Sequence, residues 1–294
     1  MLGEQWVKET DFRKMLEHVM GLEPWDGNPE GLKKAATYLQ SQLESLGFTV
    51  ERASKAGQRD ILLAKRPPVS DNGATVGFVG HYDVEAINKP DAWRTEPWAP
   101  TVVSQNQLYG RGTADNWGPL AHRLMALREI LPKMESNAPG ITWLLHGEEE
   151  IGSPWAMEAY GQLLASGQLG DVEVWVDETG YCAAATDGTL GRQKLLIKNE
   201  NSSVEDLIPK LEAVARKHHR DTVVENRFLT KFNGEDNDPV LKHLVKVPSA
   251  PYVGIGINDS WSAIHSPNES IPLDTLAMAA EQLEVLLQAY GSER

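Results

Sequence analysis

The chain turns abruptly from apolar to acidic within Ile141-Thr-Trp-Leu-Leu-His-Gly-Glu-Glu-Glu-Ile-Gly-Ser153. The apolar half has the length of a buried β-strand, and three consecutive glutamates and a Gly-Ser turn follow it directly. Three adjacent carboxylates repel one another, so at the end of a core strand they need cations or solvent to compensate their charge. In open α/β sheets, ligands bind beyond the carboxyl ends of the strands. The stretch therefore indicates either a solvated acidic turn or a cation site.

Apolar patterns on both sides of this stretch alternate between helical and extended spacing. We expect strands over 75–80, 172–176, 181–187, 192–198 and 222–230. We expect helices over 29–46 and 238–246, a helix that begins at a capping box formed by Ser202-Ser-Val-Glu205, and a final helix that begins at Pro272. Such alternation predicts an α/β three-layer sandwich, with a central, mostly parallel or mixed sheet and helices on both faces.

Length, charge and cysteine content narrow the class of protein. The 294 residues are enough for one large α/β domain or two small ones, and the 41% hydrophobic content is ordinary for a soluble globular protein. No apolar run is long enough to span a bilayer, and the first residues lack the order of a signal peptide, so we expect a cytoplasmic location. A net charge of −14 argues against nucleic acid and membrane partners. Because Cys182 is the only cysteine, a metal centre would have to use histidines and carboxylates.

Metal-ligating residue types follow several of the predicted strands, and the fold brings such positions to one edge of the sheet. These are His81, Asp115, Glu149 or Glu150, Asp177 or Glu178, and His265. Imidazoles and carboxylates without thiolates suit zinc, cobalt or manganese. Five ligands are too many for one catalytic zinc, so the set predicts two divalent ions that share a bridging carboxylate.

This inventory also predicts a reaction. Two divalent ions can lower the pKa of a shared water and polarise a carbonyl group at the same time. A glutamate that is not a ligand must then take the proton of the water and pass it to a leaving amine. Adjacent glutamates can divide these roles, because successive side chains of an extended backbone point to opposite sides.

Four blocks of sequence, in this order, resemble the dinuclear-zinc family of aminoacylase, carboxypeptidase G, acetylornithine deacetylase and carnosinase. They are Gly80-His-Tyr-Asp-Val84, Leu108-Tyr-Gly-Arg-Gly-Thr-Ala-Asp115-Asn-Trp-Gly-Pro119, Gly147-Glu-Glu-Glu-Ile-Gly-Ser153 and Ile264-His-Ser-Pro-Asn-Glu-Ser-Ile271. The loop from His81 to Pro119 is most similar to that of the carnosinase-like dipeptidases. The resemblance implies a zinc exopeptidase fold and hydrolysis of an amide bond in a small peptide or an N-acyl amino acid.

The resemblance also implies a role for each motif residue. It places His81 on one metal and His265 on the other, with Asp115 bridging them, while Asp83 orients His81. Arg111 is expected to anchor the loop before Asp115 through charge-assisted hydrogen bonds.

The carboxylates after the two central strands divide in the same way. Glu149 becomes the general base that activates a metal-bridging water, Glu150 becomes a metal ligand, and Glu148 has neither role. Asp177 is expected to be the remaining ligand, as in carnosinase-like members, and Glu178 is the alternative, as in deacetylase-like members.

The chain departs from the family between the Asp177 strand and the last histidine block. Relatives carry a lid and dimerisation domain there, whereas this chain has only a short replacement segment at about 199–236. The resemblance therefore implies a single catalytic domain over 1–294. The oligomeric state is therefore open. The lid of relatives supplies a histidine to the oxyanion, and the basic residues near His219 either substitute for it or only complement a helix dipole.

Several functions and side chains stay open at this point. The main expectation is an exopeptidase or dipeptidase, and the alternatives are an N-acyl-amino-acid deacylase or a non-catalytic lidless relative that acts as a binding protein. Trp117 and Trp261 are candidate substrate contacts, as is His219. His146 is expected to pack or to support the ligands, because it lies on an apolar strand.

Overall fold

The computed structural model describes residues 9–70, 73–104, 106–134, 136–177, 181–183, 190–198, 200–227 and 250–291. The predicted helix over 238–246, most of the predicted strand over 181–187, Glu178 and parts of the replacement segment lie outside these residues.

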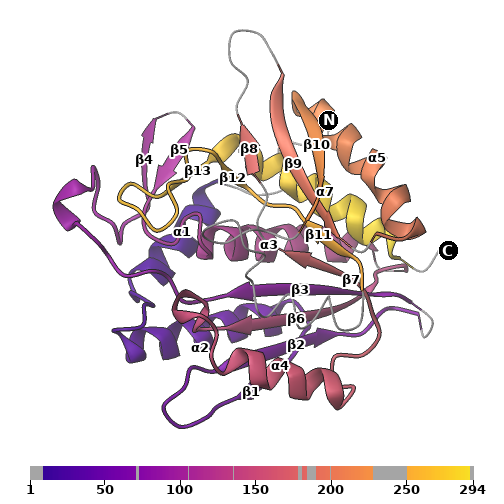
Figure 1. Ribbon diagram of the computed structural model, residues 1–294, viewed down its shortest axis with the longest axis horizontal. Helices are drawn as coiled ribbons and strands as arrows, with labels where there is room; N and C mark the ends of the chain where they lie inside the picture. Colours follow the sequence, from indigo (N-terminus) through magenta and orange to yellow (C-terminus); the bar gives the residue numbers. More distant parts are fainter. Residues whose placement is uncertain are drawn as a thin grey trace.

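The sheet is built around β6 (Gly140–His146), a strand whose seven residues are all buried. It pairs antiparallel with β2 (Ile61–Arg66) and parallel with β3 (Thr75–His81), so that His81 lies opposite His146. Strands that are buried on both faces read as continuous apolar runs, and this one ends where the three glutamates begin. The register therefore brings the ends of β3 and β6 to the same edge (Figure 1).

The described residues form one mixed sheet and a second, three-stranded sheet. The order of the large sheet is β1 (Thr49–Ala53), β2, β6, β3, β7 (Val172–Asp177), β11 (Tyr252–Gly254), β9 (Gly191–Lys198), β8 (Tyr181–Ala183) and β12 (Asn258–Asp259), with β10 (Arg220–Asn226) paired to β9. The small sheet has the order β13 (Ser270–Pro272), β5 (Gln107–Tyr109) and β4 (Thr101–Ser104). Because β7 is parallel to β3 and β11 is parallel to β7, their carboxyl ends point the same way as that of β3.

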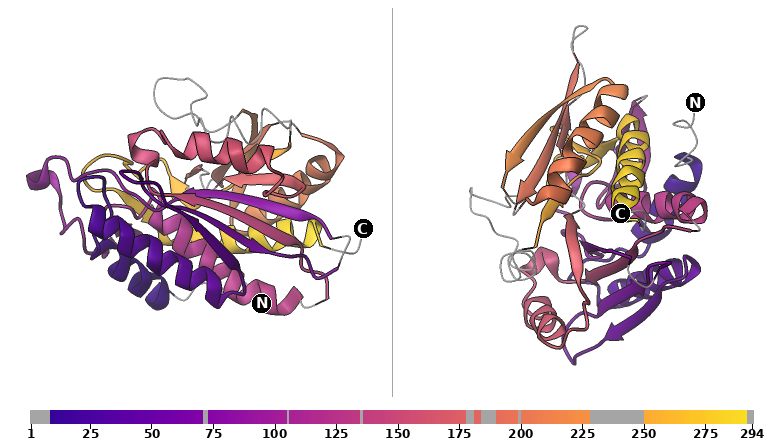
Figure 2. Two further views of the ribbon diagram at one scale, coloured as in Figure 1. Left: turned by 90° about the horizontal axis from the view of Figure 1, so that it is seen from below. Right: turned by 90° about the vertical axis from the view of Figure 1, so that its right-hand side faces the viewer.

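Helices cover both faces of the large sheet, as Figure 2 shows. One face carries α1 (Glu9–Met20), α2 (Pro29–Ser45), α3 (Trp117–Ile130) and α7 (Leu276–Ala289), and the other carries α4 (Ala156–Ala165). Alternation along β6 divides the core between them, since Trp143 and Leu145 pack with the first group and Leu144 packs with Tyr160 of α4. The predicted three-layer α/β sandwich is therefore confirmed.

The part of the replacement segment that the structure describes contains one helix and one strand, as predicted. The helix α5 (Ser202–Lys217) packs against α7, and the strand β10 follows it. The predicted capping box is wrong by one residue, because the side chain of Asn201 accepts the hydrogen bond from the Val204 amide and caps the helix.

The described residues also contain four short 3-10 turns, which are η1 (Pro90–Ala92), η2 (Leu131–Met134), η3 (Glu149–Ile151) and η5 (Leu273–Thr275). The last of these corrects the predicted start of the final helix. Pro272 ends β13 opposite Gln107, and α7 begins only at Leu276. Within the described residues, no helix is long and apolar enough to cross a membrane.

Candidate metal centre

His81 is the last residue of β3 and is almost completely buried. Its Nδ1 lies 3.1 Å from the carbonyl oxygen and 3.2 Å from Oδ1 of Asp83. Both of these oxygens accept, so Nδ1 carries the hydrogen and donates it to Asp83. The opposite ring nitrogen, Nε2, faces Oδ1 of Asp115 at 2.8 Å. Asp83 therefore contacts the imidazole directly, and its role in orienting His81 stays a prediction.

The carboxylate of Asp115 lies between the two predicted histidine ligands. Its Oδ1 is 2.8 Å from Nε2 of His81, and its Oδ2 is 3.3 Å from Nε2 of His265. Asp115 itself is buried. One carboxylate that offers a separate oxygen to each of two imidazoles has the arrangement of a bridging ligand.

The glutamate turn completes this cluster. Oε2 of Glu150 lies 2.8 Å from Nε2 of His265, and Oε2 of Glu149 lies 3.9 Å from Nε2 of His81. Ligand atoms within 4.8 Å of one another form two groups of three: His81, Glu149 and Glu150, and Asp115, Glu150 and His265. Five of the predicted residues are thus brought together from β3, η3 and the loops before α3 and β13.

The backbone of the turn is fixed by the same aspartate that contacts His81. Oδ1 of Asp83 accepts a hydrogen bond from the Glu149 amide at 3.1 Å, and its Oδ2 accepts one from the Glu150 amide at 3.0 Å. His146 supports the turn from β6, because its Nε2 lies 3.0 Å from Oγ of Ser153. His146 is buried and packs beside the turn, which is one of the two roles expected of it.

Glu148 is buried and does not belong to either of these two groups. Its Oε1 accepts hydrogen bonds from the backbone amides of Trp155 and Ala156, both at 2.6 Å, at the start of α4. Burial raises the pKa of this carboxyl, and the two amide donors oppose that shift. The first of the three glutamates is therefore directed at the amino end of α4, away from the two metal-ligating groups.

Glu269 is a structural residue that the sequence reasoning missed. It is completely buried and accepts hydrogen bonds from Arg111 Nη1 at 2.6 Å and from the amides of Gly112, Ala114 and Asp115 at 2.8–3.1 Å. The predicted anchoring role of Arg111 is confirmed, with Glu269 as its partner. The only sequence signal was the position of Glu269 in the last motif block, four residues after His265.

Electrostatics in the cluster favour a bound cation. Burial lowers the pKa of His81 and of His265, but their hydrogen bonds to carboxylates outweigh it and hold both pKa values above the ordinary range. Burial and the nearby charge of Asp115 raise the pKa of Glu150. Oε1 of Glu150 is buried and accepts no hydrogen bond from the described residues. This donor set, with more carboxylates than imidazoles, fits divalent metal ions.

Asp177 ends β7 and is buried, but it belongs to neither of the two groups. Its Oδ2 accepts a hydrogen bond from the Tyr252 hydroxyl at 2.8 Å, and its carbonyl oxygen accepts one from Arg123. Its role as a ligand stays a prediction, and the alternative ligand, Glu178, lies outside the described residues.

The three candidate substrate residues have very different environments. Trp117 is completely buried and its Nε1 donates to the carbonyl oxygen of Tyr82, which corrects the expectation that it contacts substrate. Trp261 is 74% exposed. His219 is also exposed, and within the described part of the chain it joins neither metal-ligating group.

The basic residues near His219 are used in ion pairs. Lys217 and His218 contact Glu281 of α7, and Arg220 contacts Asp274 at 2.8 Å. These contacts fasten the replacement segment to the rest of the domain.

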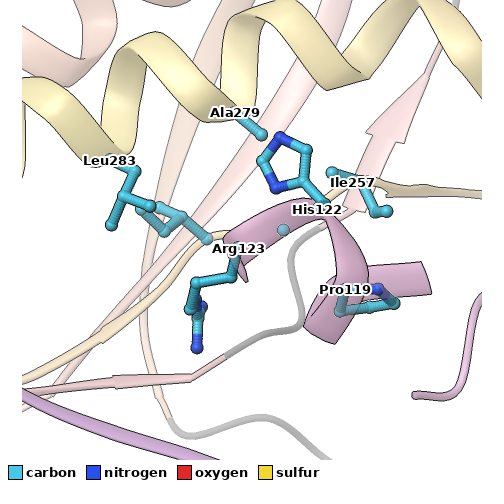
Figure 3. Close-up of a pocket in the computed structure, with 8 residues that line it drawn as sticks. Pro119, His122, Arg123, Ile257, Ala279 and Leu283 are labelled. Carbon is cyan, nitrogen blue, oxygen red and sulfur yellow. The ribbon is translucent and has the colours of Figure 1, made fainter. Parts of the chain in front are cut away.

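A separate pocket lies between α3, α7 and the residues after β11 (Figure 3). Its lining includes no carboxylate, and it consists of Pro119, His122, Arg123, Ile255, Gly256, Ile257, Ala279 and Leu283. His122 is buried there and donates from Nε2 to the Leu276 carbonyl at 2.8 Å, and burial lowers its pKa to about 4.

Solved structures share this fold at low sequence identity. Human carnosine dipeptidase 1 is similar with a TM-score of 0.71 and 14% identity, over 96% of either chain. An M20 family metallo-carboxypeptidase from Sulfolobus solfataricus is similar with a TM-score of 0.73 and 14% identity, over 97% of this chain and 99% of that one. The chain therefore shares the α/β fold of these two proteins.

Sequence comparison then identifies the family. Residues 77–289 match Peptidase family M20/M25/M40, and the chain belongs to this family, as the four motif blocks predicted. Succinyl-diaminopimelate desuccinylase 1 of Alteromonas mediterranea is 35% identical over 126 residues, which are 42% of this chain and 31% of that protein. A succinyl-diaminopimelate desuccinylase of Acinetobacter baumannii is 32% identical over 114 residues, which are 39% of this chain and 29% of that protein. These matches span less than a third of either relative.

Proposed function

We propose that this chain is a metal-dependent hydrolase that cleaves an amide bond in a small peptide, as an exopeptidase or dipeptidase. The observation that carries the proposal is the Asp115 carboxylate between His81 and His265, with Glu149 and Glu150 beside it. Zinc is the first choice of ion, and cobalt or manganese would suit the same donors.

The ligands divide into two sets around the shared carboxylate. His81 and Asp177 would hold one ion, Glu150 and His265 would hold the other, and Asp115 would bridge them. When bound, two such ions activate water as a nucleophile, polarise the carbonyl group and stabilise the charge that develops on its oxygen. Asp83 positions the first histidine and the glutamate turn for this task.

Glu149 is the general base in this proposal. Its side chain is 12% exposed, compared with 3% for Glu150, and Oε2 of Glu150 is in close contact with His265. Glu149 is therefore the glutamate that a substrate can approach. It takes a proton from the attacking water and delivers it to the nitrogen of the leaving amine.

A second candidate, an N-acyl-amino-acid deacylase, is favoured by the names of the sequence relatives, which are desuccinylases. The bond that is broken is an amide in both cases, so the same base and ligands would serve. The two candidates differ only in whether the group beyond the carbonyl carbon is an amino acid or an acyl chain.

Metal analysis combined with a substrate panel tests the proposal. We expect two zinc-like ions per chain and hydrolysis of at least one member of a panel of dipeptides, aminoacyl amides and N-acyl amino acids. Glu149→Gln should keep both ions and lose turnover, whereas Glu150→Gln should bind less metal. Full activity in the metal-free chain would refute the proposal, and metal-loaded protein that hydrolyses no member would favour the non-catalytic alternative.

A further inference from the structure

Two large apolar side chains are exposed on two of the segments that carry metal-ligating residues. Ile151 is 48% exposed and directly follows Glu150. Trp261 is 74% exposed and precedes His265 by four residues. Large apolar side chains of folded domains are usually buried, and exposed aromatic residues are frequent anchors for ligands.

Both side chains stand on turns whose backbone is fixed. Oδ1 of Asp259 accepts a hydrogen bond from the Trp261 amide at 2.8 Å, and the Asp259 amide donates to Oγ of Ser262 at 3.0 Å. Gln107 of β5 donates to the other oxygen of Asp259 at 3.0 Å. The turn that holds Ile151 is fixed by the two amide hydrogen bonds to Asp83. Hydrogen bonds therefore fix the backbone at both positions.

The two turns meet at the metal centre. Oε2 of Glu150, the residue before Ile151, lies 2.8 Å from Nε2 of His265, which follows Trp261 by four residues. Four residues of extended chain span at most about 14 Å, which limits the distance between the Cα atoms of Trp261 and His265. A substrate of two or three extended residues is about 7–10 Å long, a length that this limit leaves compatible with contact to an apolar neighbour of the reacting bond.

We propose that Ile151 and Trp261 are specificity-determining residues that contact an apolar side chain or acyl group of the substrate, on either side of the bond that is cleaved. This inference rests on the proposed amide hydrolysis and adds the class of substrate. Substrates whose flanking groups are leucine-like are favoured over those with small or acidic groups. The net charge of −14 further disfavours an anionic flanking group.

The test compares matched substrates in the metal-loaded chain. Alanyl-leucine, leucyl-alanine, alanyl-alanine, alanyl-aspartate, N-acetyl-leucine and N-acetyl-alanine form the panel. We expect kcat/KM for the leucine members to exceed that of their alanine counterparts about tenfold or more. Trp261→Ala or Ile151→Ala should remove about tenfold of this preference, mainly through KM, and leave the alanine members within about twofold. Trp261→Phe should restore most of it.

Val69→Ala is the matched control. Val69 is 46% exposed, and its amide donates to the Ala138 carbonyl near the start of β6, at the opposite end of the strand from the glutamates. It should leave every rate unchanged. Equal losses on all substrates, or none in either variant, would overturn the inference while the proposed function stands. A wild-type chain that binds metal but cleaves no substrate would instead overturn the proposed function, and the inference with it.

Discussion

Replacing Glu269 with glutamine should destabilise the domain strongly, although the residue is not a predicted ligand. The carboxylate accepts hydrogen bonds from one guanidinium nitrogen and three backbone amides, and neither it nor the Arg111 side chain is exposed. Glutamine keeps one acceptor oxygen and turns an NH₂ group toward donors that it cannot satisfy. Breaking a buried ion pair by removing one partner costs about 3–5 kcal/mol, a large part of the 5–15 kcal/mol that holds a typical domain folded.

The assay is urea unfolding followed by circular dichroism, with and without zinc. We expect the free energy of unfolding of Glu269→Gln to fall by about 3–5 kcal/mol without metal. Glu96→Gln is the matched control, because Glu96 is exposed and lies in the loop before β4, and its effect should stay within about 0.5 kcal/mol.

The same variant should also weaken metal binding, because the Asp115 amide loses its acceptor and the bridging carboxylate loses its fixed position. Loss of a group that supports a ligand lowers metal affinity about 10–100-fold. A free energy of unfolding of Glu269→Gln within about 1 kcal/mol of the wild-type value would refute this reasoning. It would mean that water or a rearranged Arg111 satisfies the loop without the carboxylate.

Three further outcomes are expected. Asp83→Asn should lower zinc affinity about 10–100-fold in calorimetry, since asparagine cannot accept from both glutamate amides and His81; unchanged affinity would contradict the orienting role. Glu148→Gln should reduce the free energy of unfolding by about 1 kcal/mol with zinc affinity unchanged, because its hydrogen bonds to the amino end of α4 are weakened and no ligand is lost. The pKa of His122 is about 4 in the folded chain and 6.5 ordinarily, so the unfolded chain takes up a proton first as pH falls. Neutral His122 therefore contributes its full share of the free energy of unfolding above pH 6.5, and about 3 kcal/mol of that free energy is lost as pH falls to about 4. The free energy of unfolding of His122→Gln should lack this loss. An equal slope of that free energy against pH in both proteins would exclude His122 as its source.

The central strands and the ligand cluster were predictable because their signals are local. Each is an apolar run that ends in a polar group, and the parallel register of β3 and β6 then brings His81 and the glutamates to one edge without any further information. Asp115 and His265 were predictable as ligand-type residues in loops after predicted strands, but only their motif blocks gave each a separate role, because loops carry no periodicity.

The errors arose where tertiary contacts override a local pattern. Pro272 fits the first turn of a helix by itself, yet pairing with β5 keeps it extended and delays α7 to Leu276. Trp117 lies in a loop-like motif, but its indole is fully buried and donates to Tyr82. Glu269 could not be singled out, since its partners lie more than 150 residues earlier in the chain.

The three glutamates show why a run of like charges can persist at a strand end. Glu148 directs its charge at the amino end of α4, where two amides receive it, so it adds little repulsion to the site. Asp83 holds the amides of the next two residues, which fixes the backbone while leaving both side chains directed at the histidine cluster. Glu150 and Asp115 still repel each other, and this repulsion adds to burial in raising the pKa of Glu150. A pair of divalent cations would remove that repulsion, so metal binding should stabilise the fold as well as supply the chemistry.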